Sequence, residues 1–212
     1  MRAPENIPDI VSPETVSASD QAFRALREQM RELTALTTAL GQAFEASSME
    51  RRIVTSAVRI AGVDGCSLYR RDGDWLHFRV VKSVTLGLMV VSDFGDDGVF
   101  RPVSLLAADG SPSTEAVSAR TVAENDVINV SDVSRLPNFD SSRVARFDQR
   151  MGYDTRSILS APVTFRGGQP LGVLQFVNAK NAVGNHVPFS GTHVQLARSL
   201  AAMLGMLWTL EP

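Results

Sequence analysis

Hydrophobic positions near the N-terminus recur in alternating steps of three and four, the spacing of a heptad seam three repeats long. The positions are Phe23, Leu26, Met30, Leu33, Thr37, Leu40 and Phe44. We predict a helix over residues 19–46, preceded by a flexible leader, residues 1–18, that shows no such periodicity. The seam fits either a helix of a second subunit or packing within the chain. We expect it to serve a subunit interface.

A second helical pattern follows directly. Ser47 to Glu50 has the composition of a capping box, and the chain after it places apolar residues on one helix face up to Gly62. The apolar face consists of Ile53, Val54, Ala57, Val58 and Ala61. A helix with one apolar face of this width is expected to lie on a sheet.

The middle of the chain changes to the period of strands. Strands are predicted at residues 65–70 and 75–84, with a turn between them, and Leu76, Phe78 and Val80 are expected to share one face. A further strand and a helix are predicted within residues 99–108 and 115–124. Two apolar runs, 158–163 and 171–177, are interpreted as a central hairpin, and a last helix is expected from about Ser190 to Leu210.

A short helix is predicted over residues 141–151. Asp140 suits the N-cap with Phe139 as its hydrophobic staple, and Gly152 suits the left-handed stop. One face of this helix combines Val144, Phe147, Asp148 and Met151. A carboxylate on an apolar face needs partners. Asp148 is therefore either paired with an arginine or backbone amides, or a polar anchor in a ligand pocket.

Taken together, several segments resemble a GAF domain, the small-molecule sensor module of cyclic-nucleotide phosphodiesterases and bacterial signalling proteins. The matching segments are Val127 to Asp132, Phe139-Asp140, Phe147-Asp148, Gly152-Tyr153, Ser157 to Leu159 with Pro162, and Gly172 to Asn178. The resemblance covers residues 47–212. It implies an α+β fold with a central antiparallel sheet of about six strands. The N- and C-terminal helices would pack on one face, and short helices with loops would enclose a ligand pocket on the other.

The resemblance also implies a set of ligand contacts. In cyclic-nucleotide-binding relatives, the positions of Ser67, Asp148, Thr155 and Gln175 contribute to the site. The pocket wall would include Val117, Ser118, Val144, Phe147 and Met151, although Val144 and Met151 stand where relatives have larger or more polar residues. A supporting motif of the family, an Asn-Lys pair followed by Phe and an acidic pair, is altered. Asn178 and Phe189 are present, but Lys180 is displaced by one position and His193-Val194 replace the acidic pair.

Composition limits the partners and the chemistry. The net charge is −2, so no basic field favours nucleic acid or an anionic membrane surface. Apolar runs are too short for a membrane span and no secretory signal pattern is present, so we expect a cytoplasmic protein. The sequence contains no motif of a serine-hydrolase, nucleoside-triphosphate-binding or zinc-protease site. The single cysteine, Cys66, is interpreted as a core residue. We therefore expect no enzymatic activity and no cofactor.

These observations favour a regulatory domain that binds cAMP or cGMP and relays binding through its terminal helices, as a homodimer, to an output domain or partner. One alternative is a sensor for another small metabolite. The other is a degenerate GAF domain that acts only in dimerisation or docking, with side chains filling the cavity. Val117, Phe147 and Met151 are the residues able to close that space, so the cavity volume distinguishes the last alternative from the others.

Overall fold

The computed structural model describes residues 13–40, 46–92, 100–135 and 141–210. Its centre is one antiparallel sheet with the strand order β3-β2-β1-β7-β6-β5, to which β4 adds by pairing with β2. The strands are β1 Val63–Asp72, β2 Trp75–Ser83, β3 Leu88–Val91, β4 Val103–Ser104, β5 Ile128–Val130, β6 Ile158–Val163 and β7 Gly172–Ala179. The fold is α+β, as the sequence predicts.

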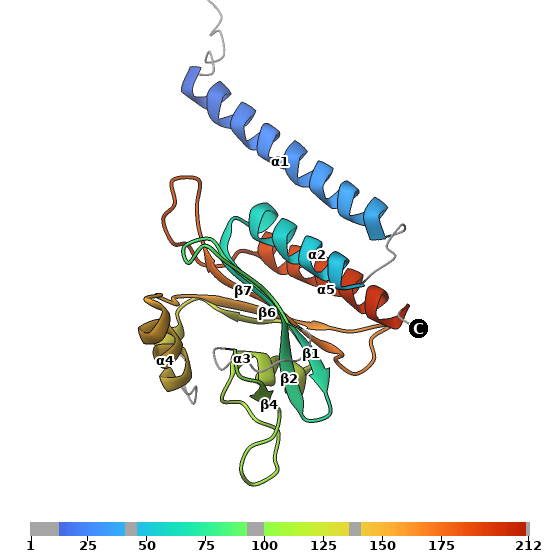
Figure 1. Ribbon diagram of the computed structural model, residues 1–212. Coiled ribbons are helices and arrows are strands. Elements are labelled where there is room, and N and C mark those ends of the chain that lie inside the picture. Colours follow the sequence, from blue (N-terminus) through green and yellow to red (C-terminus); the bar gives the residue numbers. More distant parts are fainter. Residues whose placement is uncertain (1–12, 41–45, 93–99, 136–140, 211–212) are drawn as a thin grey trace, which may run out of the picture.

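Helices cover the two faces of the sheet unequally (Figure 1). The long helices α2 and α5 lie side by side on one face, with α1 outermost, while the shorter α3 and α4 lie on the other side. The helices are α1 Pro13–Leu40, α2 Ala46–Ala61, α3 Val117–Glu124, α4 Ser141–Met151 and α5 Gly191–Thr209, with a 3₁₀ turn at Val133–Arg135. The long helices and the two shorter helices thus lie on opposite sides of the sheet.

The helical face contains the main hydrophobic core. Ile53, Val54 and Ala57 of α2 are completely buried, as their spacing predicts, and pack with Leu200 and Leu204 of α5 over the central strands. Close approach of α5 to the sheet depends on a glycine. A Cβ at Gly205 would lie 2.0 Å from the carbonyl oxygen of Thr164, so no larger residue fits without moving the helix.

The N-terminal helix differs in extent from the prediction. It begins at Pro13, so residues 13–18 are helical and not part of a flexible leader. Residues 1–12 of the predicted leader lie outside the described residues, as do Phe44 of the seam and the predicted cap at Phe139-Asp140. The helix predicted over residues 141–151 is present, and Gly152 has the expected left-handed conformation with φ +63°.

The two halves of the predicted seam of α1 lie in different environments. Phe23, Leu26 and Met30 are more than half exposed, whereas Leu36, one position before the predicted Thr37, is buried against α2. The C-terminal half of α1 is thus used for packing inside the chain, while the apolar side chains of its N-terminal half stay open to solvent in the part of the chain that is described. No helix within the described ranges is long and apolar enough to cross a membrane.

A β-bulge corrects the predicted face pattern of β2. Leu68 of β1 pairs with Val80, but the next residue, Tyr69, pairs with Phe78, so Arg79 is the extra residue. The alternation therefore shifts by one position. Phe78 packs on the pocket side, but Val80 joins the core under the helices instead of sharing the face of Phe78.

The predicted capping box at Ser47 to Glu50 is also absent. The helix already begins at Ala46, and Glu50 is completely buried, with its carboxylate bound to Arg79 and Trp208. Glu50 therefore forms a buried polar contact and does not cap the helix.

Candidate ligand pocket

A cavity of about 800 Å³ lies on the face of the sheet that the long helices do not cover. Its floor comes from the central strands and its walls from α3, α4 and the chain before β4. The lining from the strands includes Ser67, Tyr69, Phe78, Val81, Ile158, Gln175 and Val177. The lining from the helices and loops includes Phe100, Arg101, Glu115, Val117, Ser118, Val144, Arg146, Phe147, Gln149, Arg150, Tyr153 and Thr155. The volume is within the usual range of small-molecule sites.

Most of the site residues expected from the resemblance meet in this cavity. Ser67, Val117, Ser118, Val144, Phe147, Thr155 and Gln175 all line it. Asp148 and Met151 do not belong to the lining. Val117 and Phe147 line the cavity without filling it. Among the described residues, their side chains therefore do not close the space, as those of a degenerate domain would.

Asp148 is occupied by its own chain. Its carboxylate accepts hydrogen bonds from the backbone N–H of Thr155, at 2.9 Å, and from the Thr155 hydroxyl, at 2.8 Å. This is the paired arrangement that the sequence left open, with a backbone amide and a hydroxyl as the partners. Asp148 thus fixes the turn that carries Thr155 into the cavity wall.

The floor carries two polar side chains next to each other. Ser67 on β1 is paired directly with Gln175 on β7. Among the described residues, no side chain or backbone group hydrogen-bonds to the Ser67 hydroxyl or the Gln175 amide. On the adjacent β6, Ser160 is completely buried and accepts from Thr121 of α3. Ser67 and Gln175 are therefore the polar groups of the floor that remain available to a ligand.

Aromatic rings form a continuous wall around one side of the cavity. Successive ring centroids are 4.3 Å apart for Tyr69 and Phe78, 5.2 Å for Phe78 and Phe100, 6.2 Å for Phe100 and Phe147, and 6.3 Å for Phe147 and Tyr153. These are contact distances for aromatic pairs. Of these residues, Phe147 is the one that the family resemblance includes in the ligand site. The others could not be assigned to the site from the sequence, because they come from segments up to 84 positions apart (Tyr69 to Tyr153), which only the fold brings together.

The charged part of the lining is mostly basic. Arg146 and Arg150 are one turn apart on α4, and Arg101 lies in the chain before β4. Within the described lining, Glu115 is the one acidic side chain. Next to Glu115, α3 begins after Ala116 without a side-chain cap. Guanidinium groups of this kind are able to bind an anionic group of a ligand.

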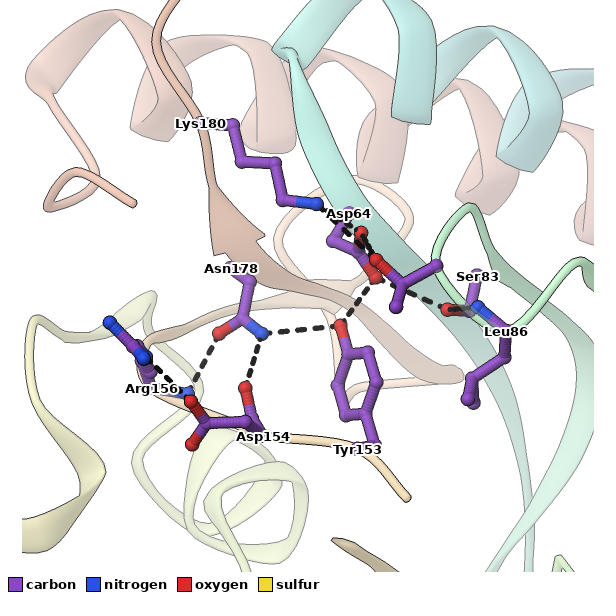
Figure 2. A network of polar contacts seen from close by, with 9 residues as sticks. Asp64, Ser83, Leu86, Tyr153, Asp154, Arg156, Asn178 and Lys180 are labelled. Atoms are coloured by element: carbon purple, nitrogen blue, oxygen red, sulfur yellow. Dashed lines mark hydrogen bonds and ion pairs between the residues drawn. The ribbon is translucent and has the colours of Figure 1, made fainter. Parts of the chain in front are cut away.

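A polar network holds Tyr153 from behind the cavity (Figure 2). The Tyr153 hydroxyl donates to Asp64 Oδ2 at 2.7 Å and accepts from Asn178 Nδ2 at 3.2 Å. Asp64 also accepts from Ser83 and Thr85 and forms an ion pair with Lys180. Burial and the neighbouring Asp64 carboxylate raise the pKa of Tyr153, so its hydroxyl remains a donor.

This network rebuilds the altered family motif from other residues. Lys180, displaced by one position, finds its acidic partner in Asp64 at the start of the sheet. Burial alone would raise the pKa of Asp64, but hydrogen bonds from Lys180, Thr85 and Tyr153 lower it below the ordinary value.

Asn178 keeps a structural role in the same region. With φ +57°, it accepts from the backbone N–H groups of Arg156 and Ser157 and donates to the carbonyl of Asp154. His193, at one position of the missing acidic pair, instead caps α5, because its Nδ1 accepts from the Ser190 N–H. The region behind the pocket is thus held in place without the acidic pair.

Cys66 faces the opposite side from the pocket floor. It is buried in the core under the helices, and burial raises the pKa of its thiol. Within the described ranges, no group of His, Cys, Asp and Glu side chains has the arrangement of a metal site.

Comparison with known proteins agrees with this architecture. A family model described as GAF domain matches residues 49–208, and the chain therefore belongs to the GAF domain family. The comparison with curated protein sequences finds no match.

Solved structures with low sequence identity share the fold. The GAF domain of an Acinetobacter phosphoenolpyruvate-protein phosphotransferase is 16% identical with a TM-score of 0.61, covering 86% of this chain and 93% of its own. The equivalent domain from Coxiella burnetii is 15% identical with a TM-score of 0.62, covering 85% and 92%. Free methionine-R-sulfoxide reductase from Neisseria meningitidis, solved with its substrate, is 15% identical with a TM-score of 0.59, covering 85% and 88%.

Proposed function

We propose that this chain is a regulatory sensor domain that binds a cyclic nucleotide, cAMP or cGMP, in the cavity. The observation that carries the proposal is an open cavity of about 800 Å³ with an aromatic wall and two available polar groups on its floor. A flat base matches the rings, because aromatic faces stack on heterocycles.

The polar groups suit the other parts of such a ligand. The amide of Gln175 both donates and accepts, which matches the edge of a purine base, and Ser67 beside it adds one hydroxyl. The cyclic phosphate carries one negative charge, and Arg101, Arg146 and Arg150 supply positive charge along the lining. Another planar anionic metabolite is the second candidate, because the same observations favour it.

Two alternatives receive less support. A docking module without a ligand would be expected to fill the space, whereas Val117 and Phe147 leave it open. A sulfoxide reductase that regenerates itself through an internal disulfide needs a second cysteine, and the sequence contains only Cys66, which is buried away from the cavity. We therefore expect no catalytic activity.

The proposal includes a homodimer formed through the terminal helices. Phe23, Leu26 and Met30 on α1, and Met206 and Leu210 at the end of α5, are exposed apolar side chains. The three on α1 follow the heptad spacing, which suits an identical helix of a second subunit. Ligand binding would act on the output only through a difference in affinity between two packings of these helices.

Calorimetric titration of the purified, nucleotide-stripped chain tests the proposal. One cyclic nucleotide is expected to bind at one site per subunit, with AMP as the silent control. Absence of heat and of a melting shift with cAMP and cGMP at millimolar concentration would exclude the cyclic-nucleotide function.

A substitution at the floor makes the test specific to the site. Gln175→Glu replaces a group that donates and accepts with one that only accepts, so it favours a base edge with two donors, as in guanine. The ratio of cGMP to cAMP affinity is expected to rise about tenfold, the effect of one hydrogen bond of about 1.4 kcal/mol. The control Gln175→Leu should lower the affinity for both cAMP and cGMP. If the ratio of cGMP to cAMP affinity is unchanged in Gln175→Glu, the base does not contact Gln175.

A further inference from the structure

A buried polar contact joins three elements on the side of the sheet opposite the cavity. Glu50 on α2 is completely buried, and Arg79 on β2 and Trp208 on α5 are 7% and 5% exposed. Glu50 Oε2 accepts from Arg79 Nε at 3.2 Å and is 3.1 Å from Arg79 Nη2. Glu50 Oε1 accepts from Trp208 Nε1 at 2.6 Å. One carboxylate thus holds a strand residue and a residue near the end of α5.

The strand residue in this contact is the extra residue of the bulge. Arg79 lies directly after Phe78, whose ring lines the cavity 4.3 Å from Tyr69. Because the bulge adds one position, Arg79 and Val80 both serve the helical face, and the next lining residue of β2 is Val81. The bulge therefore decides which side chains of β2 form the cavity wall.

Arg79 also holds the neighbouring edge strand. Its Nη1 donates to the carbonyl of Ser92 at 3.2 Å, and its own carbonyl accepts from the Ser92 N–H at 2.8 Å. Ser92 follows directly after β3. The position of Arg79 thus sets the local geometry of β2 and of the end of β3.

Burial makes this arrangement costly to abandon. A carboxylate without exposure to water needs its cationic partner, because an uncompensated buried charge is strongly destabilising. If the bulge slipped by one residue, the Arg79 side chain would turn away from Glu50. The pair therefore stabilises the register that places Phe78 in the cavity wall.

We propose that Glu50 and Arg79 are positioning residues of the ligand pocket, which hold Phe78 in its wall and tie ligand binding to the packing of Trp208 on α5. This inference builds on the proposed ligand site. A ligand in contact with Phe78 acts on the adjacent Arg79 and, through Glu50, on the indole of Trp208. Because Trp208 directly precedes Thr209, the last residue of α5, the connection reaches the C-terminal end of that helix.

The first test needs no ligand. The chain contains two tyrosines, Tyr69 and Tyr153, so 3-fluorotyrosine labelling yields two ¹⁹F signals, which Tyr153→Phe assigns. Replacing the pair by apolar residues, Glu50→Leu with Arg79→Met, avoids leaving a lone buried charge. We expect this double variant to stay folded and to shift the Tyr69 signal in the same direction as Phe78→Leu. An unchanged Tyr69 signal in the folded double variant would overturn the positioning role.

The second test uses cAMP and cGMP as probes. In a Trp75→Phe background, Trp208 is the only tryptophan, and saturating nucleotide is expected to change its emission. In the double variant this change should disappear and the affinity should fall about tenfold, the effect of 1.4 kcal/mol. The control Asp126→Asn with Arg198→Met removes an exposed ion pair of α5 and should change neither readout.

The outcomes separate the two proposals. If neither nucleotide binds the parent chain, the cyclic-nucleotide function fails, and the ¹⁹F result alone decides the positioning role. If a nucleotide binds the double variant as tightly as the parent, with the same Trp208 response, the pair is purely structural and the inference is wrong.

Discussion

Removing one hydroxyl, in Tyr153→Phe, tests how strongly the network behind the cavity stabilises the fold. The ring that lines the cavity is kept, so the aromatic wall is unchanged in shape. What is lost is the contact to Asp64 at 2.7 Å and the contact from Asn178 at 3.2 Å. The substitution therefore isolates the polar link between the pocket and the sheet.

The structure sets the expected magnitude. Asp64 retains Ser83, Thr85 and Lys180 as partners, and Asn178 retains the Asp154 carbonyl, so neither buried group is left without a partner. The main loss is one hydrogen bond to a charged acceptor, which contributes about 1.5 to 3 kcal/mol. We expect the free energy of unfolding at pH 7 to fall by about 2 kcal/mol.

The effect should depend on pH in a defined direction. Burial opposes ionisation of Asp64, but its hydrogen bonds, including the one from the Tyr153 hydroxyl, lower its pKa in the folded protein. Because the pKa of Asp64 is lower in the folded protein than in the unfolded chain, where it is about 3.9, ionised Asp64 stabilises the fold at pH values above about 3.9. This stabilisation is lost as the pH falls through the pKa of Asp64 in the folded protein. The difference between parent and Tyr153→Phe should therefore be largest near neutral pH and shrink below about pH 4.

Urea unfolding followed by circular dichroism at several pH values measures both effects, because urea leaves charges unscreened. Ser111→Ala is a matched control, since it removes a hydroxyl that donates to Asp109 at 2.6 Å in an exposed turn. We expect it to have little effect on the free energy of unfolding, because the turn is exposed to solvent. A loss for Tyr153→Phe no larger than the control, or one that persists unchanged in acid, would refute the assignment of this hydroxyl.

Two further predictions concern packing and the site. Gly205→Ala should lower the free energy of unfolding by about 2 kcal/mol or more, because its Cβ would lie 2.0 Å from the Thr164 carbonyl, whereas Gly191→Ala on the same helix meets open space and should be neutral in thermal melts. Asp148→Ala and Thr155→Ala should each weaken binding of the cyclic nucleotide by about 1 to 3 kcal/mol, as measured by calorimetry. Asp148→Ala acts by releasing the turn that Asp148 holds. If both variants bind like the parent, this turn is not part of the site.

The helical parts of the fold could be predicted closely from the sequence. The apolar spacing of α2, the stop at Gly152 after α4 and the apolar hairpin of β6 and β7 agree with the structure. Such patterns depend on residues within a few positions of one another, so they are readable without the fold. The start of α1 could not be predicted in this way, because residues Pro13 to Ala18 show no apolar periodicity, although proline suits the first turn of a helix.

The pocket could be predicted in part. The resemblance to the family placed Ser67, Thr155 and Gln175 in the lining, but it also included Asp148, which binds the turn of Thr155. Residue type and helix face cannot reveal that difference, because both arrangements need a carboxylate on the same face. The choice depends on where Thr155 lies relative to α4.

What the sequence by itself determined is the set of elements, their exposed and apolar faces, and the family with its general pocket. Tertiary structure alone decided the bulge at Arg79, the pairing of Glu50 with Trp208 across 158 positions, and the ion pair between Asp64 and Lys180 across 116. The physical reason is burial. A buried charge must find a partner wherever the fold supplies one, and that partner is fixed by three-dimensional packing and not by neighbours along the chain.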